Sequence, residues 1–79
     1  MSQIDLQIGE HERIAALSPR EREVLVSLAD GLSVKEISSR LGVSRSTASI
    51  HLARIYEKLG VNKAVIAVRK AIRAGLIDP

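Results

Sequence analysis

The 79-residue chain contains no cysteine, no phenylalanine and no tryptophan, and Tyr56 is its single aromatic residue. Without cysteine, a disulfide framework and a cysteine-ligated zinc site are both excluded. Without large aromatic side chains, leucine, isoleucine, valine and alanine must fill the core, which suits a small helical bundle of modest stability. No apolar run reaches the roughly 18 residues that a membrane span needs, and no signal-peptide pattern begins the chain. We therefore predict a soluble, cytoplasmic protein without membrane contact.

The sequence also lacks the patterns of an enzyme. Ser44, Ser46 and Ser49 stand outside any G-x-S-x-G setting, and no pair of carboxylates is placed for acid–base chemistry. His11 has no neighbouring histidine, cysteine or acidic pattern like that of a zinc site, so a solvated histidine is expected. We predict no catalytic activity, no metal and no cofactor.

Basic and acidic residues are separated along the chain. Residues 1–36 hold four basic and seven acidic side chains, whereas residues 37–79 hold eight basic and two acidic ones, within an overall net charge of +3. A basic half favours a negatively charged partner such as a nucleic acid. A chance fluctuation of surface charge is the alternative that these counts leave open.

Residues 33–60 have the pattern of two helices joined by a tight turn. Ser33 with Glu36 forms an S-x-x-E capping box, which begins the first helix. Gly42 is expected to end it, because glycine adopts the left-handed backbone without a steric penalty. Ser44 then caps a second helix, predicted over 45–59. Two helices joined by a short turn with glycine are typical of a helix-turn-helix.

The second of these helices has two different faces. Its apolar residues recur at helical spacing and are expected to face the core: Ala48, Leu52, Ile55 and Leu59. The opposite side carries Ser46, Ser49, Ile50, Ala53, Arg54 and Glu57. A face of short side chains with one outward isoleucine fits the major groove, which is about 12 Å wide. The alternative is a solvated face that includes a single exposed isoleucine, which is common.

Further helices are expected on both sides of this motif. Ser18, Pro19 and Glu21 give a capping box with proline at the first helical position. Asn62 is expected to cap a fourth helix over 62–74. The sequence therefore predicts an all-α fold, a compact four-helix bundle containing a helix-turn-helix.

The start of the chain is harder to assign. Ile4, Leu6 and Ile8 alternate with polar residues in a strand-like pattern, whereas residues 10–17 suit a helical turn or two that buries Ile14 and Leu17. We predict a short, irregular or partly helical N-terminal extension or linker over 1–17, followed by the domain over 18–77.

The fourth helix has two candidate apolar faces. Val65, Val68 and Ile72 are expected to form its core stripe. A row of small residues lies beside that stripe and is interpreted as a self-association surface, because small side chains allow close packing between helices; it consists of Ala64, Ala67, Ala71 and Ala74. The alternative is that alanine occurs there because it favours helix formation.

An ordered series of motifs resembles a known family. The segments are LSPREREVL at 17–25, ADGLS at 29–33, KEI at 35–37, KLGV at 58–61 and AIRAGLI at 71–77, with Leu41, Thr47 and His51 between them. Together they resemble the LuxR-type, or GerE/NarL/FixJ-type, DNA-binding domain, without a gap from 17 to 77.

This resemblance implies a bacterial transcription regulator that binds double-stranded DNA as a homodimer, with RNA polymerase as a second candidate partner. The base-facing candidates are Arg45, Ser46, Ser49, Ile50 and Ala53. The phosphate-contact candidates are Lys35, Ser44, Thr47, His51, Arg54 and Lys58. The dimer-interface candidates are Ala64, Ala67, Lys70, Ala71 and Ala74.

Two of the base-facing residues differ from the family's usual pattern. Ser49 and Ala53 are short where longer polar side chains are common, so few direct hydrogen bonds to bases are expected. Base reading then depends on Ile50 against a thymine methyl group, on Arg45 or Arg54, and on DNA shape.

Two other functions remain open at this point. The C-terminal helix-turn-helix of a sigma factor shares the opening motif, although the continuation over 62–77 argues against it. A stand-alone interaction module could instead pair with a full-length regulator through the alanine row.

Overall fold

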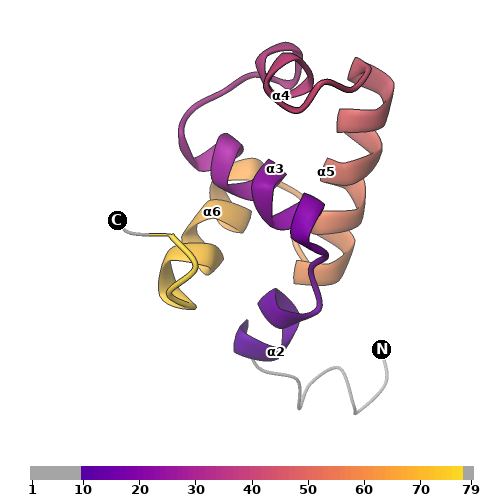
Figure 1. Ribbon diagram of the computed structural model, residues 1–79. Coiled ribbons are helices and arrows are strands. Elements are labelled where there is room, and N and C mark those ends of the chain that lie inside the picture. Colours follow the sequence, from indigo (N-terminus) through magenta and orange to yellow (C-terminus); the bar gives the residue numbers. More distant parts are fainter. Residues whose placement is uncertain (1–9, 78–79) are drawn as a thin grey trace.

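The computed structural model describes residues 10–77, and this part of the chain is helical throughout its regular structure (Figure 1). The helices are α2 (Glu10–Ala15), α3 (Pro19–Ala29), α4 (Val34–Leu41), α5 (Arg45–Leu59) and α6 (Ala64–Arg73). The all-α prediction, with a helix-turn-helix and a partly helical N-terminal segment, is confirmed. The strand-like pattern at Ile4, Leu6 and Ile8 lies outside the described residues.

Helix α5 is the central element, because it packs against each of the other four helices. In Figure 1 it runs along one side of the molecule, with α4 at one end and α2 near the other. All five helices contribute buried apolar side chains to the core, together with the segment that follows α2: the core consists of Ile14, Leu17, Val24, Leu25, Ile37, Ala48, Leu52, Ile55, Leu59, Ala67 and Ala71. No helix among the described residues has both the length and the apolar character to cross a membrane.

Side-chain caps begin α3, α4 and α5 as expected. The Glu21 N–H donates to Ser18 Oγ at 3.1 Å and the Ser18 N–H donates to Glu21 Oε1 at 2.8 Å, which completes a capping box. Ser33 and Glu36 repeat the same arrangement at 3.2 and 2.9 Å. These bonds satisfy backbone donors that a helix start leaves without a carbonyl partner.

Glycine ends α4 and α5 in the same way. Gly42 and Gly60 both have φ of +68°, in the left-handed region that only glycine enters without strain. In each case the following valine, Val43 or Val61, donates its N–H to a carbonyl five residues earlier and packs against the core. This hydrophobic contact after a left-handed cap fixes where the chain turns.

The start of α6 differs from the prediction. Lys63 is the residue that precedes the helix, in extended backbone, and it makes no side-chain capping bond. Asn62 therefore does not cap α6, which begins at Ala64. A lysine side chain has no oxygen to accept from the first-turn N–H groups, so α6 begins without the support that the other long helices have.

The two apolar faces of α6 are exchanged relative to the prediction. Ala67 and Ala71 are fully buried, with 0% exposure, and therefore belong to the core. Val65 is 63% exposed, and Val68 and Ile72 are half-buried without being part of the packed core. The expected core stripe was wrong, and so was the assignment of Ala67 and Ala71 to a self-association surface. Small side chains let α6 approach α3 and α5 closely, and this packing decides which face turns inward.

The N-terminal helix is part of the same packed body. Helix α2 contacts α5 and α6, and Ile14 and Leu17 are buried in the core as expected. The apolar core of the described residues therefore includes side chains from within the segment predicted as an extension.

Ala67→Glu should severely destabilise the fold, because it places a charge at a position with no solvent exposure. The matched control is Val65→Glu on the outer side of the same helix, which should change the free energy of unfolding by no more than about 0.5 kcal/mol. Thermal unfolding followed by circular dichroism at low protein concentration measures both. A wild-type melting temperature for Ala67→Glu would contradict the inward placement of the alanines.

Candidate nucleic-acid interface

The outer face of α5 is the first candidate for contact with DNA. Its inner face buries Ala48, Leu52, Ile55 and Leu59. The outer face exposes Arg45, Ser46, Ser49, Ile50, Ala53, Arg54 and Glu57. Ile50 is 52% exposed, as the helical spacing predicted. The structure therefore separates the two faces of α5 as the sequence indicated.

The exposed face of α5 is shallow. Ser46, Ser49 and Ala53 carry short side chains around Ile50, so nothing long stands beside this apolar group except arginine at the margins. A helix with its side chains is about 10–12 Å across, which matches the major groove. Hydroxyl groups can hydrogen-bond to base edges, and a branched apolar side chain can contact a thymine methyl group.

The start of α5 is suited to an anion. Ser44 Oγ accepts the Thr47 N–H at 3.0 Å and lies 3.0 Å from Thr47 Oγ1, to which it donates. The first turn contains no acidic residue and begins with Arg45. The N–H groups of Arg45 and Ser46 have no helical carbonyl to bind, so they are available to a phosphate.

His51 lies one turn after Thr47, and both side chains are half-buried. The Nδ1 atom of His51 is buried without a hydrogen-bond partner among the described residues. His51 can therefore bind a phosphate only through Nε2. Lys35, near the start of α4, and Arg54 are exposed, which suits the contacts expected of them.

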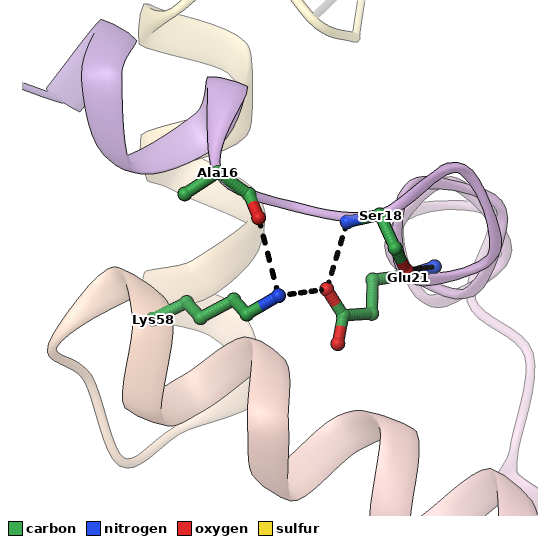
Figure 2. Close-up of polar contacts among 4 residues, drawn as sticks. All are labelled: Ala16, Ser18, Glu21 and Lys58. Atoms are coloured by element: carbon green, nitrogen blue, oxygen red, sulfur yellow. Dashed lines mark hydrogen bonds and ion pairs between the residues drawn. The ribbon is translucent and has the colours of Figure 1, made fainter.

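Lys58 is placed differently from the other phosphate candidates. Its Nζ lies 2.7 Å from Glu21 Oε1 and donates to the Ala16 carbonyl at 3.1 Å (Figure 2). The ammonium group is thus directed toward α3 and the turn that follows α2, while 37% of the lysine side chain stays exposed. Sequence reasoning missed this partner, because Glu21 is 37 residues away and already has a role in a capping box.

Glu21 is buried at this contact, with 5% of its side chain exposed. Burial raises the pKa of Glu21, but hydrogen bonds from Lys58 and from the Ser18 N–H, with the positive charge of Lys58, outweigh it and lower the pKa below the ordinary 4.5. The folded chain therefore favours the charged carboxylate, which stabilises the fold above the ordinary pKa.

The residues predicted to form the dimer interface differ in their burial. Ala67 and Ala71 are inside the protein, whereas Ala64, Lys70 and Ala74 are half-buried. The Nζ atom of Lys70 donates to the Leu59 carbonyl at 3.2 Å, so this lysine supports the end of α5. Within the described residues, no group of histidine, cysteine or acidic side chains is arranged to hold a metal ion.

Comparison with known proteins gives a consistent result. The family model described as "Bacterial regulatory proteins, luxR family" matches residues 15–71, which include α3, α4 and α5 in full. The probable transcriptional regulatory protein NarL of Mycobacterium tuberculosis is 48% identical over 62 residues, covering 78% of this chain and 29% of that protein. The probable transcriptional regulatory protein SgaR of Hyphomicrobium methylovorum is 40% identical over 65 residues, covering 82% of this chain and 31% of that protein.

A solved structure is also similar. The response regulator ChrA of a heme-sensing two-component system has a TM-score of 0.75 and 42% sequence identity, with 78% of this chain and 31% of that one covered. The chain spans about a third of the length of the curated relatives NarL and SgaR.

The free energy of unfolding should fall as the pH is lowered through the depressed pKa of Glu21, because protonation removes the charge that Lys58 and Ser18 hold. Glu21→Gln should flatten that fall. Urea unfolding at a series of pH values from about 6 down to about 2 measures this pH dependence of the free energy of unfolding. Glu36→Gln is the matched control, because Glu36 makes the same capping bonds at an exposed site. An equal flattening in both variants would show that burial beside Lys58 adds nothing.

Proposed function

The chain belongs to the LuxR family of bacterial regulatory proteins and carries the DNA-binding helix-turn-helix of a transcription regulator, and from this premise we propose that α5 lies in the major groove of double-stranded DNA and reads its sequence. The observation that carries the proposal is that one side of α5 is buried and the opposite side is exposed. Four apolar residues hold the helix from behind, while Ile50 and its short neighbours face outward.

The proposed contacts divide into base reading and phosphate binding. Base reading falls to the exposed residues Arg45, Ser46, Ser49, Ile50 and Ala53. Phosphate binding falls to the start and margins of α5, through Ser44, Thr47, His51 and Arg54, and to the start of α4, through Lys35. Phosphate contacts fix the register of the protein on the duplex, and base contacts give it sequence preference.

Since bacterial DNA lies in the cytoplasm, we propose that location for the protein. Contact with RNA polymerase stays a prediction.

Selection of bound sites from random duplex DNA tests this function directly. The wild-type protein should enrich a defined half-site. Ile50→Ala should relax the preference at one base pair by about 1 kcal/mol, at the low end for a base contact, because the shorter alanine does not reach a thymine methyl group.

Glu57→Ala is the matched control, because Glu57 lies on the same exposed side about two turns further along α5. It should leave the selected sequence unchanged. Failure of the wild-type protein to enrich any sequence would refute sequence reading, and an identical profile for Ile50→Ala would remove Ile50 from it.

We also propose that two copies associate through the outer side of α6. Val65, Val68 and Ile72 lie along one edge of the helix at spacings of three and four residues, so their side chains form a stripe. Val65 is largely exposed, and the packed core of the described residues includes none of the three. An exposed apolar stripe gains stability when a second copy covers it. An isologous contact of this kind gives a two-fold dimer.

Val65→Glu should shift the protein to monomer, because it places like charges opposite each other across a two-fold interface. Sedimentation velocity over a range of protein concentrations measures the association. Arg69→Glu, one turn further on, reverses an exposed charge beside the stripe and is the control for a change of charge that leaves the three apolar side chains in place. Unaltered sedimentation of Val65→Glu in a protein that does dimerise would place the interface elsewhere.

A further inference from the structure

Four residues from three segments meet at the end of α5 that is far from its cap at Ser44. A single carboxylate oxygen of Glu21, Oε1, accepts hydrogen bonds from the Lys58 ammonium at 2.7 Å and from the Ser18 N–H at 2.8 Å. The ammonium also donates to the Ala16 carbonyl at 3.1 Å. Figure 2 shows Lys58 reaching from α5 across to the turn between α2 and α3. We call Ala16, Ser18, Glu21 and Lys58 the junction.

The burial of Glu21 makes the pairing costly to break. Glu21 has 5% of its side chain exposed and Lys58 has 37%. If Lys58 turned outward to a phosphate, Glu21 would remain as a buried carboxylate without a cation. Leaving one member of such a pair without its partner is strongly destabilising, whereas an exposed lysine binds a phosphate without that penalty.

Other bonds fix the same end of α5. The guanidinium of Arg13 on α2 donates to the Lys58 carbonyl at 3.4 Å, and Lys70 on α6 donates to the Leu59 carbonyl at 3.2 Å. A Cβ placed on Gly60 would lie 3.3 Å from Arg13 Nη1, so the end of the Arg13 side chain lies close to the chain just after α5 ends. The last turn of α5 is therefore tied to α2, to α3 and to α6.

The position of the last turn of α5 affects the position of the base-facing residues, because the two lie far apart along one helix. Lys58 follows Ile50 by eight residues, which is about 12 Å along a helix that rises about 1.5 Å per residue. A change of tilt at the last turn therefore displaces the base-facing part of the helix. Contacts in the groove depend on placement to within a fraction of an ångström.

We propose that Glu21 and Lys58 are positioning residues for DNA binding, which set the tilt of α5 against the turn between α2 and α3, and that Lys58 makes no phosphate contact. This inference rests on the proposed function. It gives Lys58 a positioning role in place of the phosphate contact that the sequence predicted. It also gives Glu21, which lies outside the DNA-facing surface, an effect on the affinity for DNA.

Salt dependence of DNA binding separates positioning from phosphate contact. Each phosphate that a protein neutralises adds about 0.9 to the slope of log affinity against log salt concentration. Binding of the wild-type protein, Glu21→Gln, Lys58→Met and Arg54→Met to a duplex carrying the selected site is measured over a series of salt concentrations. The temperature is one at which circular dichroism shows all four proteins to be fully folded.

Positioning predicts a distinct pattern. Glu21→Gln and Lys58→Met should both weaken binding at every salt concentration, with the wild-type slope retained. The double variant should bind about as weakly as either single one, because both remove the same interaction. Arg54→Met, the matched control on the exposed face of α5, should lower the slope by about 0.9 for each phosphate that Arg54 neutralises in the wild-type complex.

A phosphate role for Lys58 predicts the opposite. Lys58→Met would then lower the slope as Arg54→Met does, and Glu21→Gln would strengthen binding, because it releases the lysine from its partner. Either result overturns the inference while the proposed function stands. Absence of binding by the wild-type protein at every salt concentration would instead refute the proposed function itself, and the inference with it.

Discussion

The burial of one side of α5 is the constraint on which the rest of the structure depends. Ala48, Leu52, Ile55 and Leu59 place that side against all four neighbouring helices, and the opposite side is left in solvent as a consequence. A helix fixed in this way presents the same residues in the same orientation to any molecule that binds its exposed side. Preorganisation of this kind limits the entropy cost of binding.

The two ends of α5 differ in their electrostatics. The start of the helix carries the positive end of its dipole and an arginine, and it contains no carboxylate. The final carbonyls receive hydrogen bonds from Arg13 and Lys70, so cations of the protein itself occupy the negative end. The start can therefore attract a phosphate, whereas the other end is used to attach the helix to the fold.

Helix α6 illustrates a conflict that its own sequence does not resolve. It has an apolar edge of β-branched residues and a neighbouring row of alanines, and either side has helical spacing. The alanines are inside because the space beside α3 and α5 admits close approach of the backbone, and larger side chains would not fit without displacement. The displaced valines and isoleucine then become an apolar stripe on the surface, which is what a second copy could cover.

The starts of α3, α4 and α5, the ends of α4 and α5, and the two sides of α5 were determined by the sequence itself, because they follow from local rules. A serine cap, a glycine in the left-handed region and a repeat of 3.6 residues act over a few positions, and Ser33, Ser44, Gly42 and Gly60 all behave accordingly. Tertiary structure decided the inward face of α6, the packing of α2 against α5 and α6, and the pairing of Glu21 with Lys58. These depend on the shape and charge of segments tens of residues apart, and such contacts leave no periodic signal in the chain.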